Sequence, residues 1–99
     1  MKIQQGDVIL TKIDALPKDV KKLKRTAKGY ILAVGEATGH AHVIDDLEAE
    51  VFEKDGVIYI RNTQPIEIKH QEHQSVSIEP GDWIVTRVQE YDAFTEEIR

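Results

Sequence analysis

The histidines are the residues whose types and spacing are best suited to chemistry. The chain has four of them, in two pairs: His40 and His42 stand two residues apart, and His70 and His73 stand three apart. Alternate residues of a β-strand point to the same face, so the first pair shares a face. Neutral imidazole binds divalent transition metals through either ring nitrogen. The sequence therefore predicts a metal site formed by His40, His42, His70 and His73, for Zn²⁺, Ni²⁺, Fe²⁺ or Mn²⁺.

The direction of the histidine side chains follows from their neighbours on the same strands. His42 shares its strand face with Ile44, and His70 shares its face with Ile66 and Ile68. If the isoleucines point into the core, the imidazoles point inward as well and can meet at one end of the molecule. Two carboxylates close to the pairs are candidates for further ligands: Glu36 and Glu72. The alternative is four partly exposed histidines that bind only water or neighbouring carboxylates.

Two other functions are alternatives to metal binding, so whether the protein is an enzyme stays open. Two histidines with pKa values near neutrality can act as general base and general acid in metal-free phosphodiester cleavage. The basic segment Lys18–Lys28 would then hold a phosphate. The other alternative is a non-enzymatic, oligomeric protein-interaction module. The chain has no cysteine and no glycine-rich phosphate-binding motif, which excludes thiol nucleophiles and the common nucleotide folds.

The elements that must position the histidines are predicted to be strands. Period-two alternation with many β-branched residues is typical of half-buried strands. Asp55-Gly56 has the composition of a two-residue hairpin turn. About eight short strands are predicted: Asp7–Ile13, Tyr30–Glu36, His40–Asp45, Ala49–Glu53, Val57–Asn62, Ile66–His70, Val76–Ile78 and Trp83–Gln89. The second is apolar enough to be covered on both faces, and the third and fourth are candidates for one continuous strand.

The fold class that follows is all-β, in a single domain over residues 1–99. A small closed or partly open β-barrel is expected, because closure hides sheet edges that a short chain cannot otherwise cover. A β-sandwich is the alternative. Only Lys18–Lys24 and the tail Ala93–Arg99 have helical patterns.

Charge is spread unevenly along the chain, which has a net charge of −5. Residues 1–28 hold eight basic and three acidic side chains, whereas the remainder is strongly acidic. The Lys18–Lys28 segment and the C-terminal tail are therefore candidate contacts with a protein partner or with other copies of the chain. Nucleic acid is not expected, because the chain is acidic overall and its basic segment lacks aromatic residues. No apolar run is long enough for a membrane span, and the absence of an apolar leader favours the cytoplasm.

Three segments resemble a family of small uncharacterised prokaryotic and phage-associated proteins. They are Gly35-Glu36-Ala37-Thr38-Gly39-His40-Ala41-His42, His70-Gln71-Glu72-His73 and Glu90-Tyr91-Asp92-Ala93-Phe94. The resemblance covers nearly the whole chain. It implies that these segments belong to one family pattern, and it implies no activity.

A second resemblance concerns strand order. Asp7–Ile13, Ile31–Gly35 and Pro80–Val85 are similar in order to strands of the small co-chaperonin barrel. That likeness implies a ring-forming β-barrel that docks through a mobile loop, here Pro17–Lys28, although the histidine pairs have no counterpart there. The His-x-His pattern is similar to that of cupins, but this chain lacks a histidine near Ile84, where the second cupin motif would require one.

Overall fold

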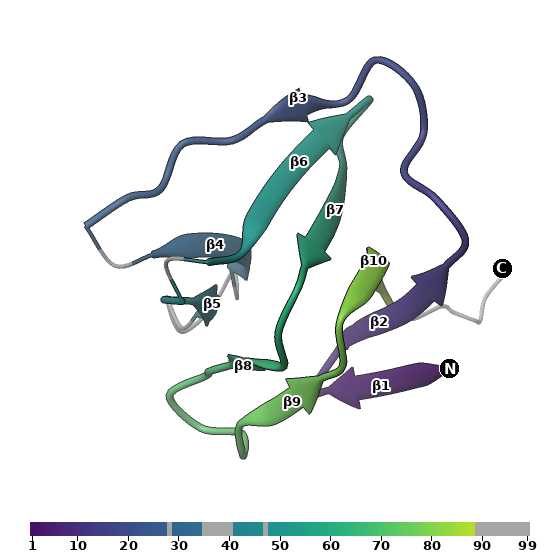
Figure 1. Cartoon of the computed structure of the whole chain (residues 1–99). Coiled ribbons are helices and arrows are strands. Elements are labelled where there is room, and N and C mark those ends of the chain that lie inside the picture. The colour runs from purple at the N-terminus through teal and green to yellow at the C-terminus, as the bar shows by residue number, and fades with distance from the viewer. Residues whose placement is uncertain (28, 35–40, 47, 89–99) are drawn as a thin grey trace, which may run out of the picture.

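Ten short strands, and no helix, are found in the part of the chain that the structure describes. The structure is a computed structural model, and it describes residues 1–27, 29–34, 41–46 and 48–88 (Figure 1). The strands in chain order are β1 (Lys2–Gln5), β2 (Val8–Ile13), β3 (Lys21–Lys22), β4 (Tyr30–Val34), β5 (Ala41–Ile44), β6 (Glu50–Lys54), β7 (Val57–Asn62), β8 (Ile66–Ile68), β9 (Val76–Ile78) and β10 (Gly81–Arg87). The predicted all-β class is confirmed.

Six of these strands form one antiparallel sheet in the order β1-β2-β10-β7-β6-β3. β10 lies at its centre, where Trp83 is paired with Lys12 of β2 on one side and with Ile60 of β7 on the other. No ladder joins β3 to β1 within the described ranges, so these strands do not close into a barrel. The sheet therefore keeps two edges, β1 and β3.

Two small sheets complete the described fold. β4 pairs with β5, and β8 pairs with β9, both antiparallel. The backbones of Val43 in β5 and Lys69 after β8 exchange two hydrogen bonds of 2.9 and 2.8 Å, which links the small sheets. β9 in turn lies beside β1 of the main sheet (Figure 1). β1, β5 and the residues after β8 therefore meet in one region.

The core fills the space between these sheets with aliphatic side chains and one tryptophan. Trp83 is fully buried, and its indole N–H donates to the Glu79 carbonyl over 3.0 Å. Burying each large apolar side chain contributes about 1.5–3 kcal/mol. The fully buried members of largest volume are Trp83, Leu10, Ile44, Ile60, Ile68, Ile78, Val8 and Val51. Ile44 and Ile68 are among them, so the expectation that they point inward is confirmed.

Sequence reasoning located most strands and one turn correctly. Val57–Asn62 and Val76–Ile78 agree with β7 and β9 residue for residue, and β6 is shifted by one residue from its predicted range. The Asp55-Gly56 turn is confirmed, because both residues have positive φ, 52° and 81°. Such values suit the type I′ turn, whose twist matches that of the flanking strands.

The predicted helix over Lys18–Lys24 is wrong. Asp19 has a φ of 64°, which ends any right-handed helix there, and Lys21–Lys22 form the short strand β3. β3 pairs with β6, and the Leu23 amide donates to the Val51 carbonyl over 2.8 Å. Pairing with an existing sheet therefore outweighs the weak helical pattern of a seven-residue segment.

Other errors concern the N-terminal strand, β4 and β5. β1 was not predicted, because Ile3 is its single large apolar residue within a polar sequence. Tyr30–Glu36 is not covered on both faces within its described part, since Ile31 is exposed while Tyr30 is buried. The third and fourth predicted strands are not continuous: β5 pairs with β4, whereas β6 pairs with β7. The predicted tail helix Ala93–Arg99 lies outside the described residues.

Candidate functional site

The candidate site lies where the β1–β2 hairpin meets β5 and the turn after β8. The chain reverses between Gln5 and Val8 through Gly6 and Asp7, and Gly6 has a φ of 58°. A positive φ at the first turn position favours glycine and gives a tight two-residue connection. The hairpin therefore presents the Gln5 and Asp7 side chains at adjacent places.

Three imidazole rings come together at this hairpin. The ring centroids of His42 and His70 are 4.4 Å apart, and those of His70 and His73 are 4.5 Å apart. The His42 and His73 rings are nearly parallel, with centroids 6.2 Å apart. His42 comes from β5, whereas His70 and His73 come from the turn between β8 and β9. His40 and Glu36, also predicted as candidates, lie outside the described residues.

Gln5 determines which nitrogen of His42 carries the proton. The Gln5 side chain is buried, and its amide nitrogen donates to the carbonyls of Ile68 and Gln74, both over 2.8 Å. Its carbonyl oxygen therefore faces Nδ1 of His42, 2.8 Å away, and must accept a proton from it. In the neutral ring, Nε2 then keeps its lone pair.

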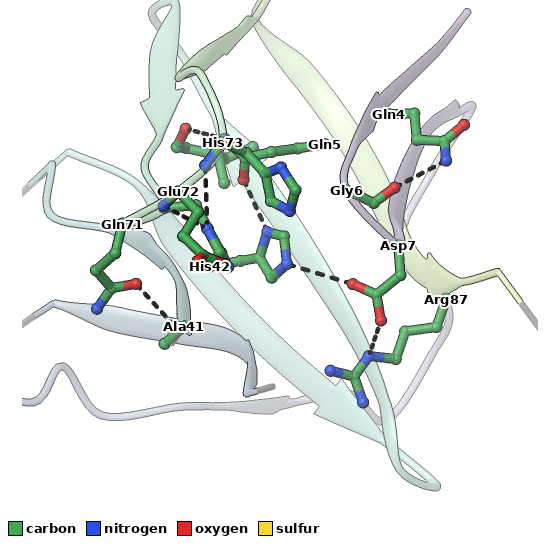
Figure 2. A network of polar contacts seen from close by, with 12 residues as sticks. Gln4, Gln5, Gly6, Asp7, Ala41, His42, Gln71, Glu72, His73 and Arg87 are labelled. Carbon is green, nitrogen blue, oxygen red and sulfur yellow. Dashed lines mark hydrogen bonds and ion pairs between the residues drawn. The ribbon is translucent and has the colours of Figure 1, made fainter. Parts of the chain in front are cut away.

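The free nitrogen of His42 faces a carboxylate. Nε2 lies 3.5 Å from Oδ1 of Asp7, and Oδ2 of Asp7 lies 3.4 Å from Nε of Arg87 at the end of β10 (Figure 2). The backbone N–H of Val88 donates to the Asp7 carbonyl over 2.8 Å, which ties the hairpin turn to β10. Gln5, His42, Asp7 and Arg87 therefore form one continuous polar chain.

The environment of His42 keeps its ring neutral. Burial lowers the pKa of His42 below its usual value near 6.5, and the neighbouring His70 lowers it further. Asp7 acts in the opposite direction, through its charge and its hydrogen bond, but does not outweigh burial. A neutral imidazole with an outward lone pair can accept a proton or bind a cation.

His70 uses one nitrogen to hold its own turn. The backbone N–H groups of Glu72 and His73 point at Nδ1 of His70 over 3.0 and 3.3 Å. An accepting Nδ1 carries no proton, so the neutral ring carries its proton on Nε2. The turn is also held to β5, because the Ala41 amide donates to Oε1 of Gln71 over 3.0 Å. In this arrangement His70 presents no unprotonated nitrogen to a metal.

His73 lies against Gly6, next to Asp7. A β-carbon placed on Gly6 would lie only 2.5 Å from Nε2 of His73, so the ring occupies the space that any larger residue would need. Figure 2 shows the His73 ring close to the His42 ring, beside the hairpin that carries Asp7. The His73 side chain is exposed and can move without disturbing the core.

The donor atoms are close together but do not yet form a metal site. Among residues 1–27, 29–34, 41–46 and 48–88, no group of three or more His, Asp or Glu side chains is arranged to hold a metal ion as it stands. The 3.5 Å between Nε2 of His42 and Oδ1 of Asp7 nevertheless fits two ligands of one ion. With bonds of about 2.0–2.1 Å, that separation gives an angle of about 115° at the metal, close to tetrahedral.

Sequence reasoning missed three residues of this site: Gln5, Asp7 and Arg87. A signal for the first two was present, because Gly6-Asp7 has the composition of a hairpin turn and Gln5 precedes it directly. With Gly6-Asp7 taken as a turn, the sequence predicts a strand over Lys2–Gln5, with Gln5 on the same face as Ile3. Nothing local marks Arg87, which reaches Asp7 only through the pairing of β10 with β2.

Across the described ranges, no helix is both long and apolar enough to cross a membrane. No curated protein and no solved structure matches this chain. One family model does match, over residues 4–88, and its description is "Domain of unknown function (DUF8820)". The match includes Gln4 and Gln5 of β1, the whole of β2 and the histidines of both pairs. Because it covers most of the chain, the protein belongs to this family of small domains.

Proposed function

We propose that the protein binds a divalent transition metal, with Nε2 of His42, the Asp7 carboxylate and the His73 ring as ligands. The observation that carries the proposal is the position of His42: Nδ1 donates to Gln5, and Nε2 faces Asp7 at 3.5 Å. Histidine ligands of metals commonly donate their second ring nitrogen to such an oxygen, which fixes the ring and its tautomer.

In the proposal, His73 is the ligand that moves when the ion binds. Two imidazoles on one tetrahedral ion, with metal–nitrogen bonds of about 2.0–2.1 Å, have ring centroids roughly 5 Å apart. The ring centroids of His42 and His73 are 6.2 Å apart, so the His73 ring has to move closer and turn a nitrogen toward the ion. Its side chain is exposed, whereas His42 is held by Gln5. Zn²⁺, Ni²⁺, Fe²⁺ and Mn²⁺ all accept imidazole and carboxylate ligands.

The proposal gives His70 a different role from the ligand role expected from the sequence. In this proposal it holds the turn through Nδ1 and becomes a ligand only by giving up its two hydrogen bonds. His40 remains a proposed fourth protein ligand, on the sequence argument alone. We expect the protein to act in the cytoplasm, as an accessory protein or a small metal-dependent enzyme.

The test is metal binding by the untagged full chain in buffers cleared of metal by chelator. Each of the four ions is titrated by calorimetry, and the melting temperature is measured with and without metal. We expect stoichiometric binding and a higher melting temperature for at least one ion. Asp7→Asn, His42→Ala and His73→Ala lower the affinity at least tenfold. The matched control is Asp45→Asn, another exposed aspartate, which pairs with Lys69 over 3.1 Å.

His70→Asn distinguishes a role of His70 in holding its own turn from a role as a metal ligand. The asparagine oxygen can accept the turn N–H groups as Nδ1 does, but the variant has no imidazole. We expect it to retain metal affinity within about twofold. Loss of affinity in a folded His70→Asn protein would make His70 a ligand. If the wild type binds none of the four ions and gains no thermal stability from them, the proposal is wrong.

A second candidate function is the protein-interaction module. The observation that favours it is the basic segment, whose described lysines are exposed in the edge strand β3 and on either side of it: Lys18, Lys21, Lys22 and Lys24. An exposed basic edge can contact an acidic surface of a partner or of another copy. Metal binding and this contact involve different regions of the molecule, so both can hold.

A further inference from the structure

An apolar groove lies between β4 and the main sheet, away from the histidines. It has a volume of about 230 Å³ and opens to solvent. Its wall is apolar and comes from three strands, and its rim is formed by a turn and by the end of β10. The wall residues are Leu32, Ala33, Ile58 and Val85, and the rim residues are Gly56, Thr86 and Arg87.

The hydrophobic core is incompletely covered at this groove. Leu32 and Val85 belong to the buried core, whereas Ala33 and Ile58 pack against it and are only partly buried. A β-carbon on Gly56 would meet nothing within 4 Å, so the space beside that turn is open. Sites for small-molecule ligands usually have volumes of about 300–1,000 Å³. This groove is smaller, so it is better suited to one large apolar side chain of a polypeptide.

The described part of the chain ends beside the groove. Thr86 and Arg87 form part of its rim, and the next residue, Val88, is the last that the structure describes. Eleven residues follow in the sequence, and they include three large apolar side chains: Tyr91, Phe94 and Ile98. Phe94 comes six residues after Val88, a stretch that can span about 20 Å. That length is sufficient for the segment to turn back and reach the groove.

Other candidate occupants fit less well. Residues 35–40 have no large apolar side chain, and Leu47 lies between two residues that do not line the groove. A second copy of the chain would have to bind from solution. The segment that follows Val88 is tethered beside the groove instead, and a short flexible tether gives an effective concentration of about millimolar. The chain's own C-terminal segment is therefore the favoured occupant.

Within that segment, Phe94 is the side chain best suited to the groove. Tyr91 carries a hydroxyl that requires a hydrogen-bond partner when it is buried. Ile98 comes ten residues after Val88, so its docking would order a longer loop at a larger cost in entropy. Phe94 has a fully apolar ring and needs only a five-residue connection, residues 89–93.

We propose that Phe94 of the C-terminal segment occupies this groove in its own chain. The ring covers the part of the core that the described strands leave open, and the acidic neighbours of Phe94 in the sequence stay in solvent. Arg87 is not needed as a charge partner, since its guanidinium pairs with Asp7. The contact does not depend on the proposed metal, so either can fail without the other.

The experiment places a nitroxide spin label next to Phe94. The chain has no cysteine, so Thr95→Cys supplies a single labelling site in the full-length protein. Leucine and isoleucine methyl groups are observed by NMR, and broadening by the nitroxide falls steeply with distance. We expect strong broadening at Leu32 and Ile58, which line the groove, and much less at Ile66, beyond the far end of β7.

A mixed sample tests whether the contact forms within one chain. Isotope-labelled protein without nitroxide is combined with spin-labelled protein without the isotope, so any broadening arises between copies. We expect little broadening at Ile58 in this sample.

Three variants of the spin-labelled chain locate the contact. Phe94→Ser and Ile98→Ser form a matched pair, since each removes one large apolar side chain from the segment. Phe94→Ser should lose most of the broadening at Ile58, and Ile98→Ser should keep it. Thr86→Trp fills the groove from an exposed position on its rim and should also lose the broadening. Its melting temperature shows whether it is folded.

Each result decides for or against the contact. Broadening within one chain that is lost in Phe94→Ser and kept in Ile98→Ser supports it. The absence of broadening at Leu32 and Ile58 overturns it, and so does equal broadening in the mixed sample, which would make a second copy the occupant. Broadening that persists in a folded Thr86→Trp protein places the segment elsewhere and also overturns it. Loss in Ile98→Ser with retention in Phe94→Ser overturns the assignment of Phe94.

Discussion

Gly6 controls the position of His73, and a single methyl group there tests the site. In Gly6→Ala, the new β-carbon would meet Nε2 of His73 at 2.5 Å and force the ring away from Asp7. We expect metal affinity to fall at least tenfold. The positive φ also costs the alanine about 1 kcal/mol of folding free energy. Calorimetric metal titration and urea unfolding measure the two effects separately.

Gly56 supplies the matched control for that substitution. It has a φ of 81° in the β6–β7 turn, and a β-carbon there would meet nothing within 4 Å. Gly56→Ala should therefore lower the free energy of unfolding by a similar amount, about 1 kcal/mol, and leave metal affinity unchanged. Equal metal affinities for the two variants would contradict the placement of His73 at the site.

His42 gives the apo protein a predictable pH dependence. Its folded-state pKa lies below the unfolded value near 6.5, chiefly because of burial. Above about pH 6.5 the ring is neutral in both states, and the stability that this difference confers is fully present. As pH falls below 6.5, the unfolded state takes up a proton before the folded state does, so the free energy of unfolding decreases.

Urea unfolding between about pH 8 and pH 5.5, with chelator present, measures this decrease. His42→Gln should show a shallower decrease, since the residue that titrates differently is gone. In Asp7→Asn the His42 pKa should fall further, because Asp7 favours the charged ring. NMR titration of the ring protons reports that shift directly. A His42 pKa that rises in Asp7→Asn would contradict the assigned geometry.

At the scale of elements, Gln5 is the side chain that joins the three sheets at the site. From β1 it donates to the backbone carbonyls of Ile68, the last residue of β8, and of Gln74, before β9, and it accepts from His42 of β5. Gln5→Leu would leave these buried groups unpaired, at about 1–3 kcal/mol for each group that water does not reach. We expect the free energy of unfolding to fall by about 3 kcal/mol in urea titrations.

Its neighbour Gln4 provides the comparison. Gln4 is exposed, and its amide donates to the Gly6 carbonyl over 2.8 Å, two residues away. Gln4→Leu should change stability by no more than about 0.5 kcal/mol. The same substitution at two adjacent positions of β1 thus compares the loss of stability at a buried side chain that links the sheets with the loss at an exposed one. Similar losses in both variants would mean that the sheets are not joined through Gln5.

The elements also explain how much of the site could be predicted from the sequence. The alternation of side chains along the strand predicts that His42 points inward, because Ile44 on the same face is expected in the core, where it lies. The approach of the 70–73 turn to β5 depends on the backbone bridge between Val43 and Lys69, and hydrophobic pattern carries no information on such pairing. Gln5 and Asp7 were missed for a related reason: β1 is too polar for its pattern to identify it as a strand.

At the scale of the molecule, the uneven distribution of charge bears on whether copies of the chain associate. The basic segment includes the edge strand β3, whose two residues are Lys21 and Lys22. Lysines on an edge strand can serve either of two purposes. They can prevent edge-to-edge pairing between copies, because a charged edge is poorly suited to it. They can also attract the acidic remainder of another copy, as the charge difference within the chain suggests.

The two purposes predict different results when both lysines become glutamate. If the lysines only guard the edge, a double Lys21→Glu, Lys22→Glu variant stays charged there and its oligomeric state is unchanged. If they attract another copy, the wild type self-associates at low salt and loses that association as salt screens the charges. The double variant is then monomeric at every salt concentration. We expect the second result in size-exclusion runs with light scattering.

Lys2→Glu reverses a single charge at the opposite edge of the sheet, on the exposed end of β1. It should leave the association intact, because the basic cluster lies at the other edge. A wild type that is monomeric at every salt concentration would remove the case for self-association and leave edge protection as the explanation of the lysines. An association that persists in about 1 M salt would instead require an apolar contact, since the Debye length there is only about 3 Å and exposed charges are largely screened.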